Sequence, residues 1–127
     1  MLTYELAQSL IAKYKDAWEK QDPDAILEIF TPDAVYRERV LGEPYKGHSQ
    51  IKEYWRTRVV EGQANIRFKL MSLYIDKNTM IAEWDAVFDD NVQRLRKHML
   101  EVAIMEIRGE KVESLREYWS SEIVGHL

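Results

Sequence analysis

The chain has 127 residues, 46% hydrophobic and 31% charged, which is typical of one globular domain over residues 1–127, and its net charge of −4 with interleaved acids argues against nucleic-acid binding. It contains no cysteine, which excludes disulfides, thiolate catalysis and cysteine-based metal sites. The N-terminal residues lack a basic and an apolar region, and no apolar run is long enough to span a membrane, so we expect a cytoplasmic protein without a membrane partner.

Two helices are expected at the start of the chain. From about Thr3 to Lys20, apolar residues recur at near-helical spacing opposite a charged side, and Thr3 is a suitable N-cap. Asp22-Pro23 then restarts the chain with an N-cap and a proline at the first helical position. This second helix is short, because Thr31-Pro32-Asp33 ends it.

Five strands and a third helix account for the rest of the chain. A short strand over Ala34–Val40 precedes a loop over Leu41–Gly47 and a helix from Ser49 to about Val60. Four long strands follow with only tight turns between them, over Ile66–Ile75, Met80–Asp89, Arg94–Ile107 and Val112–Ser120. The order α-α-β-α-β-β-β-β predicts an α+β domain whose helices cover one face of the sheet.

The strand Arg94–Ile107 is apolar on both of its faces in its central part. Both faces must therefore be covered, and the helices can cover only one of them. A second copy of the chain is the simplest cover for the other face. We expect a homodimer through Leu100, Val102 and Ile104 on the convex side of the sheet.

Several motifs in this order resemble the NTF2-like superfamily, specifically its SnoaL-like and ketosteroid-isomerase-like branch. They are Tyr14-x3-Trp18, Asp22–Ile26, Phe30–Val35, Gly47-His48-x2-Ile51-x2-Tyr54-Trp55, and Lys111-Val112 with Leu115–Trp119. The resemblance implies a cone, in which a curved mixed, mainly antiparallel sheet wraps the N-terminal helix and a small ligand enters the open mouth. This fold hosts isomerases, dehydratases, cyclases, epoxide hydrolases and non-catalytic binding modules.

The ketosteroid-isomerase pattern can be laid over these motifs residue by residue. It implies that the oxyanion-donating tyrosine is Tyr14 and that the catalytic carboxylate is Glu38. The protonated aspartate that completes the oxyanion hole in that pattern falls on Ala103. Half of the hole is therefore missing, which argues against steroid isomerisation by that mechanism.

Strand parity then predicts the wall of the cone. With Ala103 facing inward, Glu101 and Glu117 point inward as well, so three acids including Glu38 are expected in the pocket. Burial penalises the charged form of a carboxyl group and can make it a useful acid or base near neutral pH. The expected walls are Trp18, Phe30, Tyr36, Tyr54, Trp55, Trp84, Phe88, Met99, Ala103, Met105, Leu115 and Trp119.

Two functions fit this pattern. The first is a cofactor-independent acid/base enzyme (isomerase, dehydratase or cyclase type) for an apolar or aromatic molecule, with Glu38 as base, Tyr14 as oxyanion donor and Glu101 or Glu117 as second acid. The second is a non-catalytic ligand-binding or dimerisation module whose acids are held in ion pairs. The two differ at Glu38, which lies between Arg37 and Arg39 and could be paired at the surface.

The other polar residues have simpler interpretations. Glu117 could pair with Arg116 or Lys97, and Glu101 with Lys97 or Arg94. The three histidines, His48, His98 and His126, share no ligand spacing, so we expect neither a metal site nor a cofactor.

Overall fold

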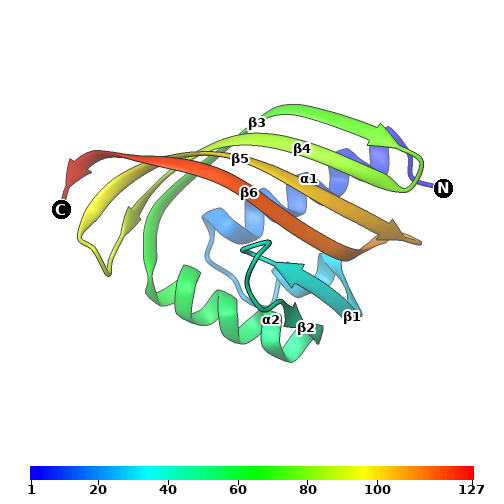
Figure 1. Ribbon diagram of the computed structural model, residues 1–127, viewed down its shortest axis with the longest axis horizontal. Coiled ribbons are helices and arrows are strands. Elements are labelled where there is room, and N and C mark those ends of the chain that lie inside the picture. Colours follow the sequence, from blue (N-terminus) through cyan, green and yellow to red (C-terminus); the bar gives the residue numbers. More distant parts are fainter.

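A single six-stranded sheet bends over the N-terminal helix in the computed structural model, which describes residues 1–127 (Figure 1). The strands lie in the order β2-β1-β6-β5-β4-β3, and only the pair β1 and β6 is parallel. This mixed, mainly antiparallel sheet confirms the α+β cone expected from the sequence. The strands are β1 (Phe30–Arg37), β2 (Tyr45–Lys46), β3 (Gln63–Asp76), β4 (Thr79–Asp90), β5 (Leu95–Arg108) and β6 (Lys111–His126).

The first helix, α1 (Tyr4–Glu19), begins where the sequence indicates. The side chain of Thr3 accepts a hydrogen bond from the backbone N–H of Leu6 at 3.1 Å, which caps the helix. The expected second helix is only a single 3₁₀ turn, η1 (Ile26–Ile29). Asp22 stabilises the turn that leads into η1, since its carboxylate accepts the backbone N–H groups of Asp24 and Ala25.

The third helix has two parts with different geometry. It begins as α2 (Gly47–Trp55) and continues as the π-helical segment η2 (Arg56–Glu61). Gly62 follows, and a Cβ atom there would lie 2.7 Å from the carbonyl oxygen of Arg58. The chain can therefore leave the widened turn tightly only with glycine at this position.

Several strand boundaries differ from the sequence prediction. The first strand runs over Phe30–Arg37 rather than Ala34–Val40: it begins directly after η1, and residues 38–40 form a bend and a turn. The strand predicted over Ile66–Ile75 begins earlier, at Gln63. The loop predicted over Leu41–Gly47 contains β2, which pairs with β1. The last strand does not stop at Ser120 but runs to His126, since it pairs with the start of β5 as far as Leu95.

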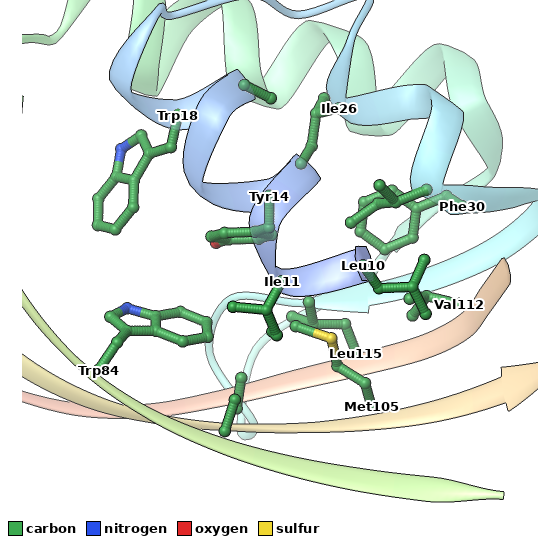
Figure 2. Packing of buried hydrophobic residues seen from close by; sticks show 14 of the residues in the cluster. Leu10, Ile11, Tyr14, Trp18, Ile26, Phe30, Trp84, Met105, Val112 and Leu115 are labelled. Atoms are coloured by element: carbon green, nitrogen blue, oxygen red, sulfur yellow. The ribbon is translucent and has the colours of Figure 1, made fainter. Parts of the chain in front are cut away.

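The narrow end of the cone is filled with side chains. Figure 2 shows Leu10, Phe30, Met105, Val112 and Leu115 packed on one side of Tyr14, with the indole rings of Trp18 and Trp84 on the other. Helix α1 supplies a buried stripe along the sheet. At the wide end, the aromatic residues Tyr14 and Trp18 near the end of α1 face an open space.

The opposite face of the sheet carries no helix (Figure 1). Leu100 is 48% exposed there, and its neighbours Val102 and Ile104 on β5 are half-buried. None of the helices is both long and apolar enough to cross a membrane.

Candidate functional site

An open cavity of about 410 Å³ occupies the wide end of the cone, between α1, η2 and the inner face of β4, β5 and β6. Its wall includes the four residues that the sequence analysis treats as catalytic candidates, Tyr14, Glu38, Glu101 and Glu117. Seven of the twelve predicted wall residues also line it: Trp18, Tyr36, Tyr54, Trp55, Phe88, Met99 and Trp119.

The other five predicted wall residues lie elsewhere. They do not border the cavity and have no exposed surface, because they pack in the solid core at the narrow end: Phe30, Trp84, Ala103, Met105 and Leu115. Their strand parity is inward, as the pattern indicates. Parity states only the side of the sheet to which a residue points, however, and not how deep the open space extends.

Glu117 lies at the inner end of the cavity on β6. Its Oε1 atom accepts a hydrogen bond from the hydroxyl of Tyr36 at 2.5 Å and a longer one from the hydroxyl of Tyr14 at 3.4 Å. The Tyr14 hydroxyl is therefore engaged by a carboxylate rather than left free to donate to an oxyanion. The expected ion pairs of Glu117 are absent, since Arg116 pairs with Glu106.

Glu101 is the second acid at the inner end. It lies opposite Trp119 across β5 and β6, while Glu117 lies opposite Ala103, so the two glutamates are diagonal neighbours on one face. Their carboxyl groups are close enough for each to shift the pKa of the other. Glu101 is only 3% exposed, and its Oε2 atom has no hydrogen-bond partner.

No cation neutralises this pair of acids. Lys97, which could have paired with either of them, is bound to Asp90 at 3.0 Å. Burial, followed by the Glu117 carboxylate, raises the pKa of Glu101 well above its ordinary value. Burial raises the pKa of Glu117 to about 7, although the hydroxyls of Tyr36 and Tyr14 oppose the shift.

Burial and the nearby carboxylate also shift the pKa of the hydroxyl groups of Tyr14 and Tyr36. Burial, followed by the Glu117 carboxylate, raises the pKa of Tyr14 and of Tyr36 well above the ordinary value. Both hydroxyls therefore stay protonated and act as hydrogen-bond donors. Together with the two glutamates they form a cluster of four hydrogen-bonding groups inside an aromatic wall.

Glu38 lies at the mouth of the cavity, just beyond the end of β1. Its side chain is 12% exposed, and its two carboxylate oxygens face two guanidinium groups. Oε1 lies 3.4 Å from Arg58, and Oε2 lies 3.6 Å from Arg39. Glu38 therefore lines the cavity, as the sequence suggests, but it is paired with arginines.

Residues from η2 and the start of β3 also line the cavity, and the sequence analysis does not anticipate them. They include Arg58, Val59, Gly62 and Gln63. Gln63 accepts a hydrogen bond from the indole N–H of Trp18 at 2.8 Å. The only signal in the sequence for this wall is Gly62 directly after an amphipathic helix. It predicts a tight turn, but not the direction in which the chain continues.

The histidines lie away from the cavity wall. A ring nitrogen of His48 lies 3.0 Å from the carbonyl oxygen of Phe30, and His98 is bound to Asp85 on the outer face of the sheet. No cluster of three or more histidine, aspartate or glutamate side chains has an arrangement that could hold a metal ion.

Comparison with known proteins gives a family and several structural relatives. A model of the SnoaL-like domain matches residues 11–115. The structure is similar to SalBIII, an epoxide hydrolase/cyclase-like enzyme with a role in pyran ring formation in the polyether salinomycin (TM-score 0.83, 20% identity, 98% of this chain and 100% of that chain). No protein with a curated description matches the chain.

Two further solved structures share the fold. One is an LEH-like epoxide hydrolase of M. tuberculosis (TM-score 0.75, 16% identity, 91% of this chain and 84% of that chain). The other is a protein with a ketosteroid isomerase-like fold from Catenulispora acidiphila DSM 44928, in complex with trimethylamine (TM-score 0.77, 20% identity, 87% of this chain and 85% of that chain). At these identities the likeness is one of fold.

Proposed function

The chain belongs to the SnoaL-like family, and we propose that it is a cofactor-independent acid/base enzyme for a small molecule with an apolar or aromatic body. Glu101 and Glu117 transfer the protons in this proposal, with Tyr14 and Tyr36 holding Glu117. The observation that carries the proposal is the pair of neighbouring buried glutamates, which has no cation beside it and borders an open aromatic cavity. Paired carboxyl groups whose pKa values are pushed upward suit proton transfer near neutral pH.

The two glutamates have different roles in this proposal. Tyr36 and Tyr14 stabilise the charged form of Glu117, so it ionises first and is the base of the pair. Glu101 has no such donor and keeps its proton longer, so it is the acid. Its Oε2 atom is buried without a hydrogen-bond partner, and a substrate oxygen placed against it would supply one.

Epoxide opening is the reaction that uses this pair most completely, and two structural neighbours are an LEH-like epoxide hydrolase and an epoxide hydrolase/cyclase-like enzyme. Glu101 gives its proton to the epoxide oxygen as the carbon–oxygen bond breaks. A water molecule or a hydroxyl group of the substrate forms the new bond to carbon and gives its proton to the carboxylate pair. The pair then holds as many protons as at the start, and no cofactor takes part.

Glu38 has a different role in this proposal from the base expected from the family pattern. Its two carboxylate oxygens face Arg39 and Arg58, so it is held in ion pairs at the mouth of the cavity. The alternative, a non-catalytic binding module, requires all the pocket acids to be held in ion pairs. That description fits Glu38 but neither of the inner glutamates, which favours the enzyme.

We also propose that two copies of the chain associate through the convex face of the sheet. Leu100, Val102 and Ile104 form an apolar row there that no helix covers. A second copy of the chain would bury this row, and no further helix or strand would be needed to cover it.

The test of the enzyme proposal uses two probes, 5-nitrobenzisoxazole for proton abstraction and styrene oxide for epoxide opening. Glu101→Gln and Glu117→Gln should each lower the rate with at least one probe about a hundredfold, in line with the usual worth of a general acid or base. Glu110→Gln, in the exposed turn before β6, is the control and should keep the wild-type rate. Wild-type rates in both cavity variants would refute the proposal.

A further inference from the structure

The charged groups of the cavity are separated by depth. The inner end holds only acids, Glu101 and Glu117, whereas the more exposed part of the wall, here called the mouth, holds Glu38, Arg39, Arg58 and the Lys97–Asp90 ion pair. Lys97 and Asp90 neutralise each other. Two guanidinium groups and one carboxylate remain, so the mouth carries one net positive charge.

The contacts of the two arginines leave their donors largely free. A guanidinium–carboxylate pair at full strength is closer than 3 Å, as between Arg108 and Asp33 at 2.5 Å in this protein. Arg58 and Arg39 lie 3.4 Å and 3.6 Å from Glu38, and each contacts a different oxygen of that one carboxylate. Most of their N–H groups therefore remain available to a further anion.

The backbone at this point is irregular in a way that directs Arg58 to the mouth. Arg58 lies in the π-helical segment η2, and Gly62 allows the chain to turn back closely over its carbonyl group. Single π-helical turns are frequent at functional sites. Glu38 bridges this segment to the bend after β1 and thereby brings the guanidinium groups to one edge of the cavity.

We propose that Arg39 and Arg58 bind a carboxylate group of the substrate, which is therefore an apolar acid with a single negative charge. Its body lies against the aromatic walls, and its reacting oxygen reaches Glu101 at the inner end. A monoanion matches the single net charge of the mouth, whereas a dianion would be repelled by Glu38. This inference rests on the proposed function, because it names the substrate class of the same cavity.

The acids outside the mouth fit this placement. A second, more open groove shares Glu38, Arg39 and Arg58 with the cavity and also holds Glu43 and Glu53. Glu53 is bound to Arg56, which lines neither space. A carboxylate that moves outward from the two arginines therefore meets the unpaired carboxylate of Glu43, which keeps the anionic end of the ligand at the arginines.

Calorimetric titration with 2-naphthylacetate and its neutral analogue 2-naphthylacetamide tests the inference at pH 8. The acid should bind the wild-type protein about tenfold more tightly than the amide, which corresponds to one charge-assisted contact. Arg58→Met and Arg39→Met should each weaken binding of the acid, and the double variant should bind the acid no more tightly than the amide, because Glu38 is then an unpaired carboxylate at the mouth. Arg56→Met is the matched control and should keep the full preference.

The outcomes separate this inference from the proposed function. Equal affinity of the wild type for both probes, or a preference that survives the double variant, would overturn the arginine site while leaving the enzyme proposal intact. If neither probe binds, the cavity does not take apolar aromatic molecules, and both proposals fail. Glu38→Gln gives an independent check: it removes the competing carboxylate and should strengthen binding of the acid about threefold with no change for the amide.

Discussion

Tyr36 donates a hydrogen bond from its hydroxyl to Oε1 of Glu117 across 2.5 Å, although the two residues are 81 positions apart in the chain. This bond stabilises the ionised form of a carboxyl group that burial would otherwise keep protonated. It therefore brings the pKa of Glu117 to about 7, within the pH range in which an intracellular or an extracellular enzyme can use it. It also leaves Glu101 as the member of the pair that holds its proton longer.

The first prediction concerns the pH dependence of activity. Because Glu117 must be ionised to act as a base, the rate with either probe should rise with pH through about 7. Tyr36→Phe removes the 2.5 Å bond and should move this midpoint upward by about one pH unit. Tyr14→Phe removes only the 3.4 Å bond and should move it less. A pH–rate profile of the three proteins measures this, and an unchanged midpoint in Tyr36→Phe would contradict it.

The second prediction concerns stability. The pKa of Glu117 is higher in the folded protein, about 7, than the ordinary value of 4.5, so folding favours its protonated form. Its contribution to stability is complete below pH 4.5 and is lost as the pH rises through 7. Glu117→Gln stays neutral and should unfold with roughly 2–3 kcal/mol more free energy than wild type at pH 8. At pH 4 the difference should be near zero.

Urea denaturation at the two pH values measures this difference, with Glu110→Gln as the control for an exposed acid. A variant that is more stable and yet inactive would show that the acid is kept for chemistry rather than for folding. A loss of stability at pH 8 would mean that the Glu117 carboxylate supports the fold.

The third prediction concerns Glu38. Glu38→Gln should keep the rate with both uncharged probes within about threefold of wild type, because the inner pair and not Glu38 transfers the protons. Steady-state kinetics with 5-nitrobenzisoxazole measures this effect. A loss of the order seen for Glu101→Gln would restore Glu38 as the base that the family pattern implies.

The fourth prediction separates the core from the cavity wall. Met105 has no exposed surface, so Met105→Ala should cost about 2–5 kcal/mol of stability while the folded protein binds the naphthyl probes as before. Met99 lines the cavity, so Met99→Ala should change probe affinity and cost less stability. Chemical denaturation and calorimetric titration of both variants test this, and the reverse pattern would mean that the open space extends further into the cone.

The fifth prediction concerns the outer face of the sheet. A wild-type dimer should elute at twice the monomer mass, and Val102→Lys should elute as a monomer, because a lysine at the centre of the apolar row cannot be buried without a partner. Light scattering after size exclusion measures the mass directly. Elution of the variant as a dimer would place the interface elsewhere.

Much of the fold and part of the site could be predicted from the sequence, because both depend on local periodicity. Helical spacing identified α1, and the alternation along β5 and β6 put Glu101, Glu117 and Trp119 on the inner side of the sheet. Period-two alternation is a property of the strand itself, so it survives whatever the strand packs against. The element order and the resemblance to a known superfamily then indicated the cone.

Such patterns could not predict the distances between helices and strands. The extent of the open space depends on how closely α1 packs on the sheet. This packing makes Met105 and Leu115 core residues rather than wall residues. The pairing of Glu38 with Arg58 depends on a π-helical turn that has no periodicity of its own. The bond from Tyr36 to Glu117 likewise exists only once β1 has paired with β6. Contacts between residues far apart in the chain are decided by packing, and they determine that Glu38 faces arginines while Glu101 and Glu117 face each other.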